Sequence, residues 1–97
     1  MNIQEFNKSF DNRVRLGIMS ILVVNEWVEF KNMKQLLNLT DGNLASHITA
    51  LEKMEYLEVR KAFVGKKPQT AYRVTDLGKK AFKAHLDALE KLLNATK

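Results

Sequence analysis

Apolar residues recur at three- and four-residue steps between Thr40 and Tyr56, and this spacing predicts one amphipathic helix. Its expected buried stripe consists of Leu44, Ile48, Leu51 and Met54. Its other side carries short, nearly uncharged residues, namely Gly42, Asn43, Ser46, Thr49, Ala50 and Lys53. A solvated face usually carries long Glu and Lys side chains, whereas small hydrogen-bonding residues suit close approach to another surface. The pattern therefore favours a helix that enters the major groove of DNA.

The chain before this helix predicts a helix, a short strand and a second helix. Residues 12–25 predict a helix that is capped by Asp11 or Asn12 and is apolar nearly all round, so we expect it to be central. The β-prone run at 26–30 predicts a short edge strand, with Trp27 and Phe30 as core anchors. Residues 31–38 predict a short helix. With Thr40 as the N-cap of the next helix, the two form a helix-turn-helix pattern.

Alternating apolar and polar residues at 57–64 and 70–74 predict the two strands of a β-hairpin. Gly65 and Pro68 mark the connecting turn, at 65–69. Because Pro68 has no backbone N–H to give to a ladder, we expect it in the loop rather than inside a strand.

Both ends of the chain carry more apolar surface than a small core requires. Residues 1–10 place three large apolar side chains at helical spacing, and residues 76–97 predict a last helix with a wide apolar stripe. One edge of that stripe can close the domain while the other packs on a second copy of the chain. The expected dimer interface comprises Ile3, Phe6, Phe10, Phe82, His85, Leu86, Leu89 and Leu93. The alternative is a single broad face that covers the chain's own core.

The positive charge of the chain is concentrated in the predicted hairpin. The formal net charge is +5, and residues 60–73 hold five basic residues and no acidic one: Arg60, Lys61, Lys66, Lys67 and Arg73. Basic and acidic residues balance in the rest of the chain. Such a concentration suggests an anionic partner, and the alternative is an ordinary solvated hairpin.

Length and composition exclude several other classes of protein. The 97 residues suffice for a single domain over residues 1–97, and 45% hydrophobic residues can form a modest core. The absence of cysteine and the presence of only two histidines, His47 and His85, argue against a metal site or a disulfide. No nucleophile–base set, carboxylate pair or phosphate-binding glycine loop is present, so we expect neither an enzyme nor a cofactor. No signal peptide or membrane span is expected, which favours a cytoplasmic protein.

Two segments resemble a known family. NLASHITALEKMEYLEV, at 43–59, resembles its recognition-helix stretch, and YRVTDLG, at 72–78, resembles the end of its hairpin. With the order α-β-α-α-β-β-α over about residues 11–93, the chain resembles the winged helix-turn-helix of small transcription regulators related to the MarR and ArsR families. The resemblance implies a mainly α fold with a small antiparallel β-sheet. The chain departs from the family in its shortness relative to MarR proteins, in lacking the cysteine pairs of metal-sensing ArsR proteins, and in carrying Glu55 and Tyr56 where a glycine is common.

The resemblance also implies roles for individual residues. In the family the second helix of the pair lies in the major groove, and the hairpin, or wing, lies over the adjacent minor groove or backbone. The implied base-reading residues are Asn43, Ser46, Thr49 and Ala50. Thr40 and Gly42 begin the helix, where free N–H groups can hold a phosphate, and we expect Asp41 to cap the helix. The implied backbone contacts are Lys53, Lys66, Lys67 and Arg73, with Gln69 near the minor groove.

The two histidines are expected to have structural positions. His47 borders the buried stripe and resembles the family histidine, so we expect a structural hydrogen bond rather than catalysis or pH sensing.

The functional hypothesis is a dimeric regulator that binds double-stranded DNA sequence-specifically, with a small-molecule effector as a further candidate partner. The alternative is a winged-helix module that binds protein through the apolar face of its last helix and does not bind DNA.

Overall fold

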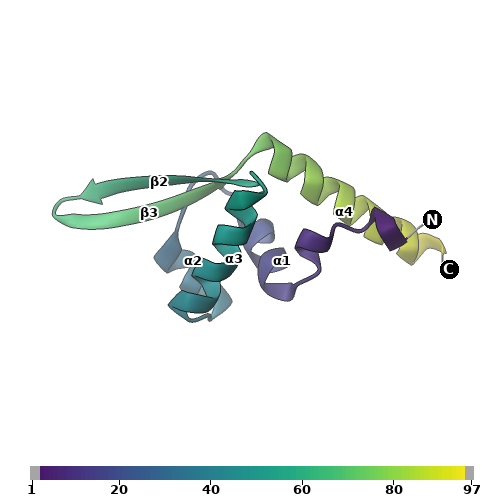
Figure 1. Cartoon of the computed structure of the whole chain (residues 1–97), viewed down its shortest axis with the longest axis horizontal. Coiled ribbons are helices and arrows are strands. Elements are labelled where there is room, and N and C mark those ends of the chain that lie inside the picture. Colours follow the sequence, from purple (N-terminus) through teal and green to yellow (C-terminus); the bar gives the residue numbers. More distant parts are fainter. Residues whose placement is uncertain (1–2, 96–97) are drawn as a thin grey trace.

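The structure, a computed structural model, describes residues 3–95 and follows the expected order of elements (Figure 1). It begins with two short 3-10 turns, η1 (Ile3–Glu5) and η2 (Lys8–Phe10). The helices are α1 (Arg13–Leu22), α2 (Phe30–Leu37), α3 (Asp41–Lys53) and α4 (Asp76–Ala95). The strands β1 (Val28–Glu29), β2 (Leu57–Val64) and β3 (Lys67–Val74) form one antiparallel sheet in the order β1-β3-β2. The expected winged helix-turn-helix arrangement is therefore confirmed.

The core lies where α1, α3 and the inner half of the sheet meet. Leu44, Ile48 and Leu51 of α3 are fully buried in one cluster with residues of α1 and of β3. Met54, the fourth member of the expected stripe, is 46% exposed because α3 ends before it. The apolar stripe thus fixes which face of α3 points inward, and it leaves the opposite face to solvent.

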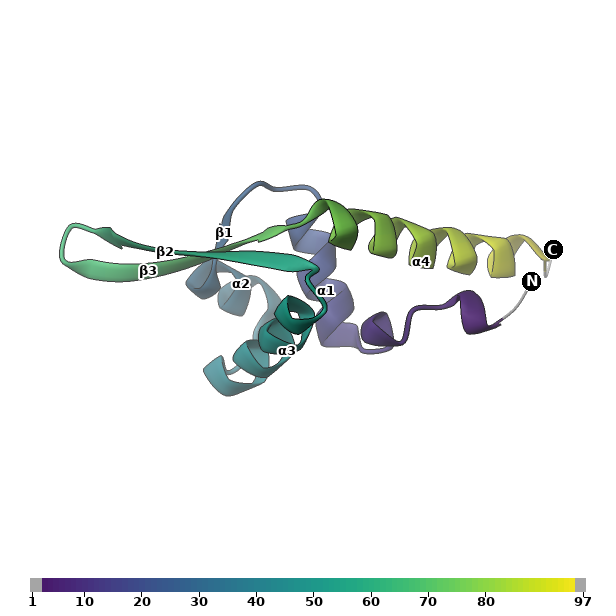
Figure 2. The ribbon, with the colours of Figure 1, turned by 45° about the horizontal axis from the view of Figure 1, so that its top comes forward.

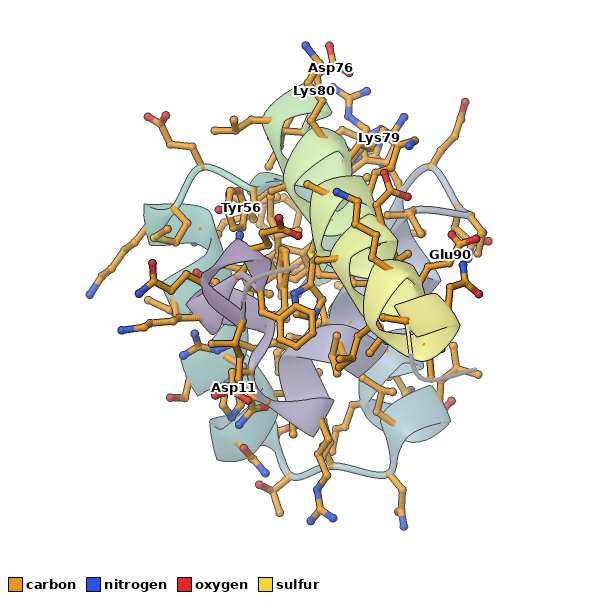
Figure 3. The ribbon with its side chains drawn as sticks, turned by 90° about the vertical axis from the view of Figure 1, so that its right-hand side faces the viewer. Asp11, Tyr56, Asp76, Lys79, Lys80 and Glu90 are labelled. Atoms are coloured by element: carbon orange, nitrogen blue, oxygen red, sulfur yellow. The ribbon has the colours of Figure 1, made fainter. Side chains whose placement is uncertain are left out.

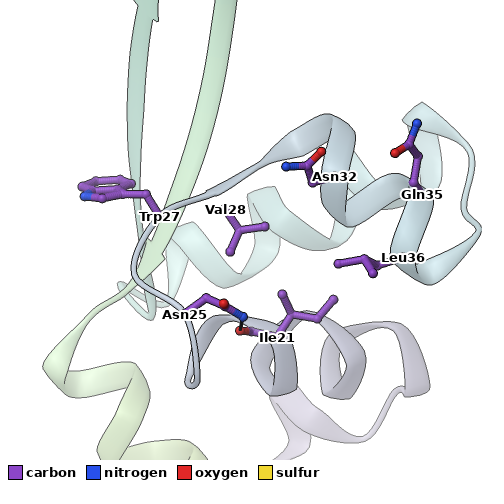
Figure 4. Close-up of a pocket in the computed structure, with 7 residues that line it drawn as sticks. All are labelled: Ile21, Asn25, Trp27, Val28, Asn32, Gln35 and Leu36. Carbon is purple, nitrogen blue, oxygen red and sulfur yellow. Dashed lines mark hydrogen bonds between the residues drawn. The ribbon is translucent and has the colours of Figure 1, made fainter.

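Hydrogen bonds from side chains explain where the first helices begin and end. Asn12 caps α1 by accepting bonds from the N–H groups of Val14 and Arg15. The helix ends at Leu22, three residues earlier than expected, and the amide of Asn25 donates to the carbonyl of Ile21, which the helix end leaves without a partner (Figure 4). The helix α2 starts at Phe30, so β1 is shorter than the expected strand at 26–30.

A left-handed residue ends α3. Glu55 has φ +63°, its N–H bonds to the carbonyl of Glu52, and the next N–H, of Tyr56, bonds to the carbonyl of Leu51. This pair of bonds is the Schellman ending, which usually has glycine at the left-handed position. The helix therefore stops at Lys53 rather than continuing to Tyr56, and the chain turns directly into β2.

The expectation that Pro68 lies in the loop is wrong. The pairing of β2 with β3 runs without a break from Leu57↔Val74 to Val64↔Lys67, so only Gly65 and Lys66 form the turn, and Gly65 has φ +67°. Pro68 lies inside β3, opposite Phe63. Bonded and non-bonded pairs alternate along an antiparallel ladder, so the pair next to the closing pair is non-bonded. The ring nitrogen of Pro68 faces the side of β3 that the short β1 does not reach, and no ladder bond is lost.

The N-terminal turns cover the core beside α4. Phe10 and Phe82, which we expected at a dimer interface, are only 1% and 4% exposed and contact each other edge to face at 5.3 Å. Tyr56 lies between these turns and α4 (Figure 3), with its ring 5.5 Å from that of Phe10 and its hydroxyl accepting from the amide of Asn7. Phe10 and Phe82 are therefore core residues of their own chain and are not available to a partner.

Trp27 is not the core anchor that its size suggested. It is half-buried just before β1, it is not part of the core cluster, and it lines the groove between α1 and α2 together with Val28 (Figure 4). Within residues 3–95, none of the helices combines the length and the apolar content needed to cross a membrane.

Candidate nucleic-acid interface

The outward face of α3 is open to solvent. Thr40, Gly42, Asn43, Ser46, Thr49 and Lys53 are exposed, and Ala50 is half-buried at the edge of the face. Residues 38–40 join α2 to α3, and Asn38 takes a left-handed conformation with φ +53°, which asparagine tolerates better than most residues. The sharp turn holds α3 across α2 with its small polar side chains outward. This is the geometry that a helix needs to enter a groove.

The start of α3 is capped by Thr40 and its acidic charge is paired. The hydroxyl of Thr40 accepts from the N–H of Asn43 at 3.2 Å, as expected of an N-cap. Asp41 does not cap the helix but forms an ion pair with Lys34 of α2, at 2.9 Å. This pairing moderates the repulsion that a free carboxylate would exert on a phosphate at the same helix end.

Gly42 has no packing reason to be glycine. A Cβ at this position would meet no atom within 4 Å, and its φ is not positive, unlike that of Gly65. In Gly78, by contrast, a Cβ would lie 2.3 Å from the carbonyl oxygen of Tyr56. Gly42 therefore leaves the first turn of α3 bare on its outer side, where backbone N–H groups can approach an anion closely.

The hairpin has two faces, and they carry different residues. Positions opposite each other in the ladder share a face, so Leu57, Val59, Lys61 and Phe63 lie on one face with Pro68, Thr70, Tyr72 and Val74. The inner part of this face is buried on the helices through Leu57, Tyr72 and Val74. Lys67, Gln69 and Arg73 lie on the opposite face, and Lys66 is in the turn.

Arg73 is held by neighbours at the base of the hairpin. Its guanidinium forms a bidentate pair with the carboxylate of Glu58, its cross-strand partner, at 2.9 and 3.0 Å. It also lies over the ring of Trp27 at 4.6 Å, and Arg60 lies over the same ring at 4.5 Å. This cluster fixes β1 to the hairpin. Arg73 was expected to contact the DNA backbone; its guanidinium is paired with Glu58 but remains partly exposed, so this contact stays a prediction.

Comparisons with known proteins identify the arrangement. The sequence pattern of the winged helix DNA-binding domain matches residues 14–93. The chain belongs to this family. An uncharacterized protein of Methanocaldococcus jannaschii is 37% identical over 79 residues, which are 81% of this chain and 86% of that protein. A transcriptional regulator homologue of Pyrococcus horikoshii is 32% identical, with a TM-score of 0.85 over 92% of this chain and 88% of that one. A putative transcriptional regulator of Salmonella typhimurium, at 23% identity, has the same fold, with a TM-score of 0.71 over 92% and 80% of the chains.

The winged helix is thus a DNA-binding protein of the transcription-regulator type, and the family gives no support to an enzymatic activity. The candidate DNA-binding parts are α3 and the hairpin of β2 and β3, which we now call the wing. Both lie at the end of the molecule away from η1 and the last turns of α4 (Figure 1). Among the residues expected in the interface, the exposed face of α3 and the wing-tip residues Lys66 and Lys67 are on this end, and Gln69 is half-buried beside them.

Two residues of the wing, Lys61 and Phe63, were expected in the hairpin but were not among the residues expected to contact DNA. Both are exposed and share the wing face that continues from the buried Leu57. The alternation from Leu57 through Val59 to Phe63 was visible in the sequence. The alternation alone does not determine which residues of the second strand share this face, because that depends on the register, which the two-residue turn fixes.

His47 has the expected structural hydrogen bond. Its Nδ1 accepts from Nε of Arg15 at 3.1 Å, and the same guanidinium donates to the carbonyl of Ser9. Burial, and then the positive charge of Arg15, lower the pKa of His47 below its usual 6.5. The neutral imidazole therefore links α3 to α1 and to the N-terminal turns.

The remaining acidic groups and histidines do not form a metal site in the part of the chain described. Among residues 3–95 no three His, Asp or Glu side chains gather as metal ligands. His85 instead accepts a bond from the N–H of Asn7 at 3.0 Å and contacts the rings of Phe6 and Phe10.

Proposed function

We propose that this winged helix is a dimeric transcription regulator that binds a pseudo-palindromic site in double-stranded DNA. The observation that carries the proposal is the exposed, nearly uncharged face of α3 with its bare first turn at Gly42. Side-chain amides and hydroxyls of such a face can bond base edges in the major groove. Because the chromosome is the partner, the proposal places the protein in the cytoplasm of its cell.

Base reading is assigned to Asn43, Ser46, Thr49 and Ala50, and phosphate binding to Thr40 and Gly42 at the helix start. Asparagine can pair bidentately with adenine, serine and threonine bond several bases, and the methyl groups of Thr49 and Ala50 suit thymine. Lys53, Lys66 and Lys67 are assigned to the DNA backbone, and Gln69 to the groove beside the wing. Backbone contacts position the protein without reading sequence.

The contact with a second copy of the chain is assigned to the apolar surface of α4 and the N-terminal turns. After removal of the buried Phe10 and Phe82, the proposed interface comprises Ile3, Phe6, His85, Leu86, Leu89 and Leu93. Leu93 is 61% exposed and Ile3 79% exposed, and neither belongs to the core cluster. A groove lined by Ile3, Phe6, Leu16 and Leu89 runs between these elements, and it is also where a small-molecule effector would bind. The alternative of a protein-binding module rests on this same surface, and the family assignment favours DNA binding instead.

Selection of bound duplexes from a random pool, followed by binding titrations at several salt concentrations, tests this proposal. A specific regulator enriches a related set of sequences, and its affinity falls steeply with salt as phosphate contacts release counterions. Failure to enrich any sequence would exclude sequence-specific recognition. An affinity that does not change with salt would exclude phosphate binding.

Two pairs of variants distinguish the residues assigned to base contacts from those assigned to the DNA backbone. Changing Lys66 or Lys67 to Ala removes a phosphate contact, so binding should weaken about equally on selected and random DNA, and the salt slope should fall by about 1 for each lysine. Changing Asn43 or Ser46 to Ala should instead cost about 1–3 kcal/mol on the selected site and change the preferred base at one position. If both pairs have the same effect on selected and random duplexes, the assignment of α3 as the reading helix is wrong.

A further inference from the structure

We propose that Phe63, at the wing tip, contacts DNA through its apolar ring. In this proposal the wing tip lies in the minor groove next to the major groove that α3 enters. The inference rests on the proposed function, because it needs α3 to be seated in the major groove. It assigns a specific contact to a large apolar side chain that is 75% exposed, although phenylalanine is among the residues most often buried.

The face on which Phe63 lies is the first reason. Phe63 is on the same wing face as Leu57, Tyr72 and Val74, which pack on the helices. Beyond the core this face continues without cover, on the side of the sheet where α3 lies. Figure 2 shows the hairpin extending past α2 and α3 with its tip clear of the other elements. A duplex seated on α3 would therefore meet the face of Phe63 first, and Lys67 and Gln69, on the opposite face, would reach the duplex only around the wing tip.

The reach of the wing is the second reason. Phe63 lies six positions beyond Leu57 along β2, which at about 3.3 Å per residue places it roughly 20 Å beyond the core. One turn of B-DNA is about 34 Å, so the centres of adjacent major and minor grooves are roughly half of that apart. The wing is thus long enough to place Phe63 at the groove beside the one that α3 enters.

The surroundings of Phe63 give the third reason. Lys61 lies two residues away on the same face, and Lys66 and Lys67 follow at the tip. An apolar side chain among cations suits a polyanion whose grooves expose sugar and base edges, and inserted apolar side chains are an established way to open a base step from the minor groove. Pro68, directly across the strand, has a fixed φ and stiffens the backbone that carries the ring.

The test compares Phe63→Ala with Val64→Ala on the selected duplex. Val64 is the adjacent exposed apolar residue, at 61%, and lies on the other wing face, so it is a matched control. Phe63→Ala should weaken binding about tenfold, the scale expected for exposing a buried aromatic ring. Its salt slope should equal that of the wild type, because an apolar contact releases no counterions. Val64→Ala should bind like the wild type, and Phe63→Leu should retain most of the affinity.

The outcomes separate this inference from the proposed function. If the wild-type chain binds no duplex, both the proposed function and the role of Phe63 are excluded. A wild type that binds as proposed, with Phe63→Ala unchanged or no weaker than Val64→Ala, removes only the role of Phe63. A Phe63→Ala variant that keeps its DNA affinity but changes its oligomeric mass would show that the ring contacts a second copy, and the inference would be wrong.

Discussion

At the scale of single residues, Gly42 separates the needs of the fold from those of binding. A methyl group there would meet no atom of the chain, and helices favour alanine over glycine. We expect Gly42→Ala to leave the free energy of unfolding unchanged or to raise it by up to about 1 kcal/mol. DNA binding should nevertheless weaken about tenfold, because the methyl group interferes with a charge-assisted bond from the helix start to a phosphate.

Denaturant unfolding and binding titrations on the same preparation measure both effects of Gly42→Ala. Gly65→Ala provides a contrast, since its φ of +67° strains any residue with a Cβ and its loss should appear in stability. Gly42→Ala binding as tightly as the parent would show that no phosphate sits at the start of α3.

His47 gives the stability of the molecule a pH dependence with a definite sign. Burial, followed by the charge of Arg15, lowers its pKa in the folded chain below the value of 6.5 in the unfolded chain. Above pH 6.5 the imidazole is neutral in both states, and its contribution to stability is fully present. As the pH falls below 6.5, the unfolded chain takes up a proton that the folded chain resists, so stability is lost down to the lowered pKa.

The corresponding prediction is that His47→Gln loses less stability than the wild type between pH 7.5 and 5.5. Urea unfolding at several pH values measures the difference, and the glutamine oxygen can still accept from Arg15. Parallel curves for the two proteins would mean that His47 does not carry this dependence.

At the scale of elements, α3 ends at a left-handed position that is occupied by a residue other than glycine. Glu55 takes the left-handed conformation, which costs an L-residue roughly 1–2 kcal/mol relative to a helical one. Glu55→Gly should therefore raise the free energy of unfolding by about 1 kcal/mol, with unchanged DNA affinity because the exposed α3 face is untouched. The matched control is Asn38→Gly at the end of α2, where asparagine already tolerates φ +53° and the gain should be smaller. Equal or reversed gains in the denaturation midpoint would exclude backbone strain at Glu55.

Elements could be predicted from the sequence where one local period decides them, and not where pairing between distant segments decides. The three- and four-residue spacing of Leu44, Ile48 and Leu51 is enough to set the inward face of α3, so its opposite face follows. The position of Pro68 depends on which side of the ladder its nitrogen faces, and that requires the hairpin register. The ion pair of Arg73 with Glu58 depends on the same register.

At the scale of the whole molecule, periodicity identified apolar faces without showing what covers them. Phe10 and Phe82 belong to the same kind of stripe as Leu89 and Leu93, yet the first two cover their own core. Which of these side chains are buried and which are exposed depends on the folded shape of the chain. The molecule measures 55 × 25 × 21 Å, and α4 extends beyond the core (Figure 1). The surface left on α4 is therefore narrower than the sequence suggested and lies on its outer half.

This outer half of α4 makes the dimer testable without harm to the fold. Leu89 and Leu93 are exposed in the single chain, so changing both to Glu should leave the thermal unfolding of each protomer nearly unchanged. Charges placed in a shared apolar interface should instead halve the mass measured by sedimentation or light scattering. Leu77→Glu is the control, because Leu77 is a similarly exposed leucine on the first turn of the same helix.

The same variant connects the dimer to DNA recognition. Two linked copies bind both half-sites of a palindrome as one unit, so the Leu89→Glu, Leu93→Glu variant should bind the full site about a hundredfold more weakly than the wild type. Its affinity for an isolated half-site should equal that of the wild type, since α3 and the wing are unaltered. A wild type that is already monomeric would place dimerisation elsewhere or on the DNA alone. A variant that keeps its mass would show that the outer half of α4 is not the interface, because two adjacent carboxylates could not remain buried there without partners.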